Sequence, residues 1–212
     1  MHFMRSICTA RTAAAPILVL LAILSAAYGQ DDAKYSHEAQ AALIPEELGE
    51  VYLGMPFKEF AANFDFAESE VHDTRFGPLP VTVKLAKGPV RSVFFKVHGL
   101  TQAETAALKT PGTTTVDQLD PKNIPDNGFV YEISLTYEPG FDLHSYVIKK
   151  YGDNGDVRKS DDPYHMYDIQ WFPKTSDGLA WLIRVFHTDK SPKTLRLIGR
   201  IPGTEWEIEE FN

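Results

Sequence analysis

Histidines and carboxylates are the side chains of this sequence best suited to metal binding, but their spacing predicts no metal centre. His165 and Asp168 are three residues apart in a segment with strand periodicity, which places them on opposite faces of the strand. His187 and Asp189 could share a face, but they lie at a strand end beside a turn. Zinc usually takes three or four converging ligands, and the sequence after residue 29 contains no His-x-His or His-x-x-x-His pair. We therefore expect polar histidines that bind no metal.

Catalytic motifs are also missing from the sequence. Asp153–Asp156 is rich in acidic and amide residues, but its spacing does not match a calcium-binding loop. Adjacent carboxylates such as Glu46 and Glu47 point apart rather than toward one another, and no Gly-x-Ser-x-Gly nucleophile motif occurs. We expect no catalytic residue and no cofactor. A hydrolase that uses two carboxylates in a sheet cleft is the alternative.

Aromatic side chains are the remaining candidates for a functional site. Phe94, Phe172, Phe186 and Tyr137 fall on several expected strands. If neighbours such as Val93 fill the core, some of these rings lie on the less buried face of the sheet, where a contiguous aromatic surface would mark a binding site. The alternative is that both faces of the sheet are covered, so that the rings only pack. We predict a binding surface that includes the four aromatic residues.

The clearest secondary-structure signal spans Gly128–Tyr151. From Val130 to Tyr137, large or aromatic residues alternate with others, which is the period of a strand with one buried face. A Pro-Gly turn ends this strand, because proline lacks the N–H that the sheet needs. Apolar residues then recur at helical spacing, and Gly152 marks the helix end. The segment therefore predicts a strand, a turn and a helix.

The remaining elements predict an α+β fold, an antiparallel sheet with helices packed on one face. A turn-rich stretch divides them, so we expect an N-terminal segment at 30–48, a first half at 49–109, a linker at 110–127 and a second half at 128–212. Each half contains a strand, a helix and a hairpin, which raises duplication as a hypothesis.

The first half is expected to contain a strand at Gly49–Gly54, a helix at Phe57–Phe64, a hairpin at Pro80–His98 and a capped helix at Thr101–Lys109. After the helix of the second half we expect a loop at Gly152–Pro163, a hairpin over residues 167–186, a strand at Leu195–Ile201 and an acidic edge strand at Glu205–Glu209.

Residues 1–29 have the features of a secretory signal peptide. Arg5 and Arg11 precede an apolar run at Ala13–Ala27, and small residues precede a cleavage position after Gly29. The run has about 15 residues against about 20 needed to span a bilayer, so we expect cleavage rather than a membrane anchor. Because the single cysteine, Cys8, lies before the apolar run, it cannot carry a lipid on the mature chain. We predict an exported protein, periplasmic or extracellular, without a stable membrane anchor.

The charge balance argues against nucleic acid as a partner. The whole chain has a formal net charge of −8, and loss of Arg5 and Arg11 with the leader lowers it to about −10. A net negative surface repels nucleic acid and anionic lipid.

Two short motifs resemble a family of exported domains. Gly54-Met55-Pro56 with Phe57-Lys58-Glu59-Phe60 is similar to the helix start of β-lactamase-inhibitor-protein-like domains, a fold shared by small outer-membrane assembly lipoproteins. Tyr146–Gly152 resembles the helix end of small periplasmic proteins. The resemblance implies a binding or scaffold role with paired helix-and-sheet units. The sequence lacks the lipid-acceptor cysteine of the assembly lipoproteins after its apolar run.

Together these features predict an exported, non-catalytic protein that binds another protein or an envelope component through its sheet face. A binder of a small molecule or carbohydrate, with a cleft between the halves lined by Trp and Tyr, is the second hypothesis. A hydrolase is the third.

Overall fold

A computed structural model describes residues 34–72, 79–111, 117–159, 167–187 and 194–207 of the protein. The predicted leader, His165, Asp189 and Ile208 lie outside the described residues, and so do their predicted roles. The described residues belong to one compact unit that begins at Lys34.

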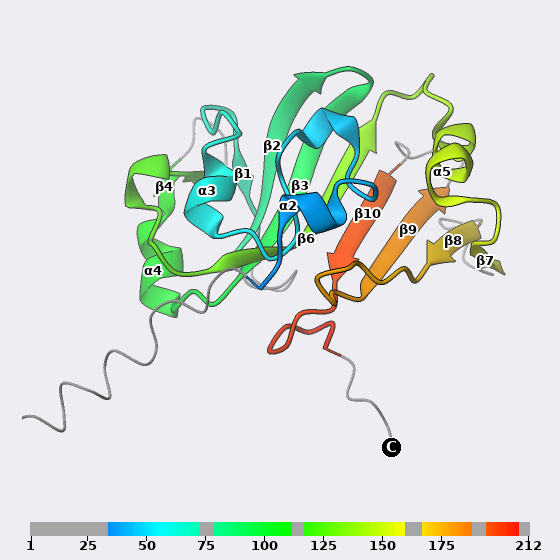
Figure 1. Cartoon of the computed structure of the whole chain (residues 1–212). Coiled ribbons are helices and arrows are strands. Elements are labelled where there is room, and N and C mark those ends of the chain that lie inside the picture. Colours follow the sequence, from blue (N-terminus) through cyan, green and yellow to red (C-terminus); the bar gives the residue numbers. More distant parts are fainter. Residues whose placement is uncertain (1–33, 73–78, 112–116, 160–166, 188–193, 208–212) are drawn as a thin grey trace, which may run out of the picture. The chain divides into compact units, whose positions relative to one another are not determined.

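An antiparallel sheet of ten strands runs through the described part of the chain (Figure 1). The strand order is β4-β5-β1-β2-β3-β6-β10-β9-β8-β7, and each neighbouring pair is antiparallel. The strands are β1 (Glu70–Val71), β2 (Pro80–Lys87), β3 (Val90–His98), β4 (Lys109–Pro111), β5 (Asp117–Leu119), β6 (Phe129–Tyr137), β7 (Asp156–Lys159), β8 (Tyr167–Trp171), β9 (Trp181–His187) and β10 (Thr194–Gly199). The predicted antiparallel, mixed α and β class is confirmed at this level.

Helices in the described residues are short. They are α2 (His37–Gln40), η1 (Glu46–Leu48), α3 (Phe57–Ala61), α4 (Gln102–Ala107), η3 (Pro121–Asn123) and α5 (Leu143–Tyr151). The Thr101 side chain and Glu104 form the predicted capping box of α4. The Asp142 carboxylate accepts a hydrogen bond from the Ser145 backbone N–H at the start of α5, and Gly152 ends the helix with a φ of 91°. Both predicted helices are confirmed.

Strand β6 lies in the middle of the sheet and is buried on both faces, so the prediction of one buried face is wrong. Cross-strand register aligns two rows of residues on opposite faces of the sheet. One row is apolar: Phe95, Ile133, Leu197 and Ile183. The next row contains Lys96, Glu132, Ile198 and Leu182, and all four are buried. Alternation in β6 therefore separates an apolar face from a polar buried face rather than from solvent.

An aromatic cluster fills the apolar side of the sheet next to β3. The Phe95 ring centroid lies 4.7 Å from that of Phe60 and 6.1 Å from that of Phe57, both on α3. Phe64 and Phe66 complete the cluster at 6.5 Å and 6.3 Å from Phe95. The stripe of phenylalanines after Pro56 thus packs α3 onto the sheet, as its helical spacing predicts.

The predicted strand at Gly49–Gly54 is not formed. Its last residue turns the chain with a φ of 87°, and a Cβ there would lie 2.4 Å from the Tyr35 ring. The segment instead meets β6 through two backbone hydrogen bonds, from Gly54 N to Val130 O at 2.7 Å and from Val130 N to Met55 O at 3.0 Å. The alternating apolar residues Val51 and Leu53 are therefore buried in the core without forming a strand, and Leu53 is hydrogen-bonded to Gln40 of the N-terminal segment.

The segment at 110–127 is not a structureless linker. Strands β4 and β5 pair with one another, and β5 also pairs with β1 at Val71↔Asp117. The Leu119 N–H donates to Ser69 Oγ at 2.9 Å, which fastens the hairpin to the segment before β1. Of the residues that suggested a linker, Pro111 belongs to β4 and Pro121 belongs to η3.

Two predictions near the C-terminus also need correction. The expected loop at Gly152–Pro163 contains β7, which pairs with β8 at the sheet edge. The acidic segment that begins at Glu205 forms turns rather than an edge strand through residue 207. The predicted β2–β3 and β8–β9 hairpins are confirmed.

Substitution of Phe95 tests the aromatic cluster. We expect Phe95→Ala to lower the free energy of unfolding by about 3–5 kcal/mol, since the ring is fully buried among four others. Phe172→Ala is the matched control, because half of its surface is exposed, and it should change stability by no more than about 0.5 kcal/mol. Urea unfolding curves measure both values, and equal losses would contradict this packing.

Candidate functional site

A network of buried charges lies on the polar side of the sheet. The Glu132 side chain is 1% exposed, and Arg196 donates to its Oε1 from Nε at 2.7 Å and from Nη2 at 2.6 Å. The Lys96 ammonium lies 3.2 Å from Glu132 Oε2, and the Trp206 indole N–H donates to the same oxygen at 3.0 Å. Both oxygens of Glu132 are therefore satisfied, as burial of a carboxylate requires.

Residues after β10 complete this network. Lys96 also donates to Glu205 Oε1 at 2.6 Å, and the Tyr131 hydroxyl donates to Glu205 Oε2 at 2.9 Å. Burial and the bond to Glu205 raise the pKa of Tyr131. The Arg196 guanidinium lies 5.1 Å from the centroid of the Trp206 ring. The turn at residues 200–207 is thus held over the sheet by charge, hydrogen bonding and ring contact, which indicates a structural role.

A second ion pair lies on the same face toward β8. Arg184 pairs with Asp168 Oδ2, and Gln170 Nε2 donates to the same oxygen at 2.6 Å. The Arg184 guanidinium is 4.5 Å from the Phe186 ring centroid. These groups bind one another, so they provide no open reactive centre.

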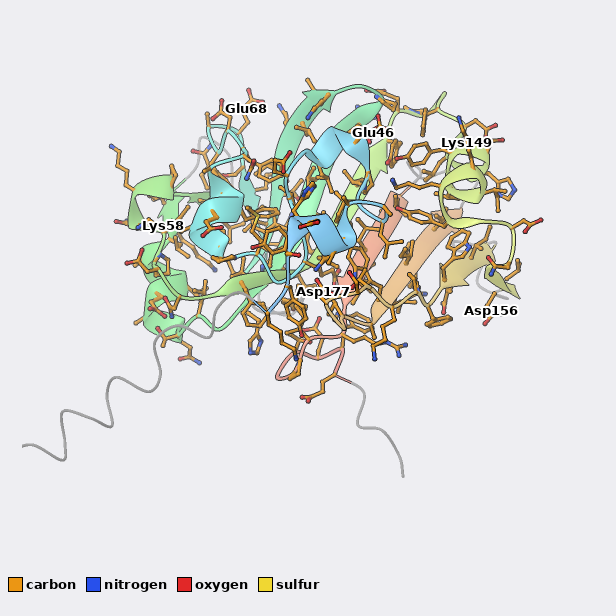
Figure 2. The ribbon with its side chains drawn as sticks, viewed as in Figure 1. Glu46, Lys58, Glu68, Lys149, Asp156 and Asp177 are labelled. Carbon is orange, nitrogen blue, oxygen red and sulfur yellow. The ribbon has the colours of Figure 1, made fainter. Side chains whose placement is uncertain are left out.

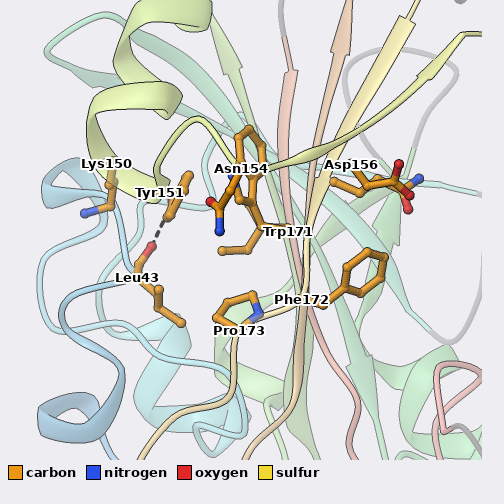
Figure 3. A pocket seen from close by; sticks show the side chains of 10 residues that line it. Leu43, Lys150, Tyr151, Asn154, Asp156, Trp171, Phe172 and Pro173 are labelled. Atoms are coloured by element: carbon orange, nitrogen blue, oxygen red, sulfur yellow. Dashed lines mark hydrogen bonds between the residues drawn. The ribbon is translucent and has the colours of Figure 1, made fainter.

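A pocket of about 350 Å³ opens on the apolar side of the sheet, beside α5 (Figure 3). Its volume is at the lower end of the range of small-molecule sites. Its lining residues come from the N-terminal segment, from α5 and the turn after it, and from β7, β8, β9 and the residues after β8: Leu43, Lys150, Tyr151, Asn154, Asp156, Gln170, Trp171, Phe172, Pro173 and Ile183. It therefore lies between the N-terminal segment and the second half, not between the two predicted halves.

The N-terminal wall of the pocket is fixed by a buried glutamine. Gln40 is fully buried, and its side-chain amide both donates to Leu53 O and accepts from Leu53 N at 2.9 Å. It also donates to Asp177 Oδ2, which accepts from the Ser36 N–H as well, each at 3.2 Å. Figure 2 shows Asp177 close to α2. These bonds place Leu43, whose carbonyl accepts from the Tyr151 hydroxyl at 2.8 Å.

Asp177 is well suited to hold this wall. Partial burial acts to raise its pKa, but hydrogen bonds from Thr175, Leu179, Gln40 and Ser36 outweigh that effect and lower it. The carboxylate therefore stays ionised and accepts four donors that come from two distant parts of the chain.

Trp171 forms the back of the pocket. Its indole N–H donates to Gly152 O at 3.1 Å, and its ring lies 5.7 Å from that of Tyr151. A Cβ at Gly155 would lie 2.7 Å from the Trp171 ring and 2.6 Å from Ile169, so only glycine allows this close approach. The glycine that suggested a calcium loop is needed for packing.

Electrostatics on the α5 side of the pocket are set by burial. Burial raises the pKa of Tyr146 to about 12, and burial also raises the pKa values of Tyr137 and Tyr151. Partial burial lowers the pKa of Lys150, while Glu46 and Glu47 act in the opposite direction. The three tyrosines stay neutral at physiological pH.

The four predicted binding residues do not form one surface. Tyr137 is fully buried, and its ring stacks on Phe141 at 4.8 Å, so its predicted exposure is wrong. Phe94 and Phe186 are half-buried, and the ring centroids of Phe94 and His72 are 5.9 Å apart. Phe172 is 50% exposed and lines the pocket. The structure therefore brings only Phe172 to the candidate site.

Sequence reasoning missed the other residues of the pocket. Leu43 lies in the expected N-terminal segment at 30–48, where no site is predicted. Lys150, near the C-terminal end of a helix, and Asn154, in a turn, have residue types common at those positions, so neither signals a site. Only the expectation of a Trp- and Tyr-lined cleft pointed toward Trp171 and Tyr151.

Two further features of the described residues bear on function. No group of three or more His, Cys, Asp or Glu side chains within them is arranged to hold a metal ion. A search of the same residues finds no helix of the length and apolarity needed to cross a membrane.

Comparisons with protein-family models, with curated proteins and with solved structures found no match to this chain. The resemblance of Gly54–Phe60 and Tyr146–Gly152 to exported domains therefore stays a prediction.

Removal of the Glu132 carboxylate tests the buried network. We expect Glu132→Ala to cost about 3–5 kcal/mol of unfolding free energy, because Lys96 and Arg196 would be left buried without this partner. Glu205→Ala is the comparison and should cost less, about 1–3 kcal/mol, because Lys96 keeps Glu132 as a partner while the Tyr131 hydroxyl loses its acceptor. Chemical denaturation gives both values, and a larger loss in Glu205→Ala would show that the network is centred elsewhere.

Proposed function

We propose that this protein is a non-catalytic binding protein of the cell envelope that holds a small molecule in the pocket beside α5. Glu132 and Asp168 are engaged in ion pairs, Asp142 caps a helix, and no three or more His, Cys, Asp or Glu side chains of the described residues gather to hold a metal. The pocket favours the second hypothesis from the sequence, a small-molecule binder, over binding through an aromatic sheet face.

The observation that carries this proposal is the composition of the pocket walls. The Trp171 indole N–H donates to Gly152 O, and the Tyr151 hydroxyl donates to the carbonyl oxygen of Leu43. These bonds hold the two rings and the Leu43 backbone in place. Such walls are formed before a ligand arrives, so little ordering opposes binding. Pockets of this kind, mostly apolar with few polar groups, are typical of ligand sites.

A protein partner is the second candidate. Phe172 and Val157 are the large apolar side chains most exposed among the described residues, at 50% and 56%. Val157 lies on β7, at the edge of the sheet, where another strand could pair. Two exposed side chains make a small apolar surface, which is why this candidate ranks second.

We also propose that the helices share one face of the sheet and that the two halves are related. Phe57 and Phe60 of α3 contact Phe95, whose row lies on the apolar face. Leu143 and Val147 of α5 are buried, whereas α4 buries no residue. The hairpins β2–β3 and β8–β9 flank β6 and β10 in the strand order. A crystal structure with α3 and α5 on opposite faces would contradict this arrangement.

Export can be tested by the mass of the protein recovered from outside the cytoplasm. We expect a mature chain that begins at Gln30, because the small residues Ala27 and Gly29 fit the cleavage site of a leader peptidase. Mass spectrometry of the periplasmic fraction measures this terminus. Recovery of the uncleaved chain in the membrane fraction would instead support an anchor.

A cavity-filling variant tests the proposed site. We expect thermal-shift screening against sugars, lipids and organic acids to find compounds that raise the melting temperature, since a ligand that binds only the folded state stabilises it. Leu43→Trp should abolish these shifts by filling the pocket. Phe94→Trp, on the opposite face of the sheet, is the control and should retain them. A flat screen, or shifts that survive in Leu43→Trp, would contradict the proposal.

A further inference from the structure

The pocket beside α5 has an uneven distribution of polar groups, which bears on the chemistry of its ligand. Figure 3 shows Asp156 and Phe172 on the far side of the β8 ribbon from Trp171, Tyr151 and Leu43. Cross-strand register agrees, because Trp171 pairs with Ile183 in the apolar row, whereas Asp156 pairs with Gln170 on the polar face. The walls formed by Leu43, Tyr151 and Trp171 are therefore apolar, whereas Asp156 and Gln170 line the pocket from the polar side of β8.

Most hydrogen-bonding groups of the pocket are already used within the protein. The Tyr151 hydroxyl donates to Leu43 O, and the Trp171 indole N–H donates to Gly152 O. The Gln170 amide donates to Asp168. The Tyr151 O–H and the Trp171 N–H cannot donate to a ligand without losing an existing bond, which disfavours a polyhydroxylated ligand such as a sugar.

Two hydrogen-bond donors at the edge of the pocket, Lys150 and Asn154, are not used within the described part of the protein. Neither the Lys150 ammonium nor the Asn154 side-chain amide forms an ion pair or hydrogen bond with another described residue. Lys150 lies 5.9 Å from the centroid of the Tyr151 ring, which keeps its stem against the pocket wall. The polar groups at this edge are thus a cation and an amide, each able to donate to an anionic oxygen.

Two carboxylates, Glu46 and Glu47, act on the charge of Lys150. Glu46 and Glu47 attract the same ammonium and disfavour a second anion, but neither forms an ion pair with it in the described residues. Lys149, the preceding residue of α5, is exposed and is not among the residues that line the pocket. Lys150 is therefore the cation available to a ligand in the pocket.

We propose that the pocket binds a small amphipathic carboxylate, with its apolar body between Leu43, Tyr151 and Trp171 and its anionic end at Lys150. This inference rests on the proposed function and names the ligand class of that site. Apolar contact supplies most of the affinity, and the charge at Lys150 selects carboxylates over neutral molecules of the same shape.

Calorimetric titration with matched probes tests the ligand class. Octanoate, below its micelle concentration, should bind saturably to the folded protein, while octan-1-ol should bind roughly tenfold more weakly, because it lacks the charge-assisted bond. Acetate and glucose should give no measurable binding, since the first lacks an apolar body and the second does not match the walls. Equal affinity for octanoate and octan-1-ol would overturn the role of Lys150 and leave the proposed binding function standing.

Variants of α5 separate the role of Lys150 from general charge. Lys150→Met should reduce octanoate affinity to that of octan-1-ol, Lys150→Arg should keep the preference, and Lys149→Met should behave as the unaltered protein. Equal loss in Lys149→Met and Lys150→Met would overturn the inference, since it would show a non-local charge effect. Binding of glucose alone would overturn the ligand class, whereas absence of binding by every probe, together with a flat thermal-shift screen, would overturn the proposed function as well.

Discussion

Burial of a carboxylate in the middle of a sheet constrains much of this structure. Glu132 is almost fully removed from water, and such a charge is tolerated only where every lone pair finds a donor. Its donors come from β3, from β10 and from the turn after β10, so three separate segments must adopt their positions together. On the polar face, the directions of hydrogen bonds and ion pairs therefore fix the arrangement of the side chains. On the apolar face, the shapes and volumes of the packed side chains fix it.

The two faces of the sheet differ in the interactions that stabilise them. The apolar face carries the phenylalanine cluster around Phe95 and, further along the sheet, the pocket in front of Trp171. The polar face carries ion pairs that engage Lys96, Arg184 and Arg196 with carboxylates. Reactive residue types are thus abundant in the sequence but already bound to one another. Open binding groups remain where the apolar face meets the turn after α5.

Elements with strong periodicity could be predicted from the sequence, and those defined by long-range contacts could not. The strand at 129–137, the helix that follows it and both hairpins have local patterns that also suit the tertiary structure. Gly49–Gly54 alternates like a strand but packs as a turn, and 110–127 has the composition of a linker but contains residues of the paired strands β4 and β5. The pocket depends on Gln40 and Asp177, whose sequence separation leaves no local signal, so only its aromatic character could be predicted. Tyr137 is not a site residue, because it alternates in phase with Ile133 and Leu135 on the apolar face and its ring packs against Phe141 and Tyr146.

The contact between Ser36 and Asp177 has a consequence for the order of folding. It joins positions 141 residues apart, so one of the first described segments of the chain is completed by one of the last. Contacts of such separation form slowly, because a long loop must close before they contribute. The wall that carries Leu43 can settle only after the β8–β9 turn has been synthesised and folded. Until then the apolar surfaces of Tyr151 and Trp171 stay exposed to water. The pocket beside α5 is therefore completed late in folding.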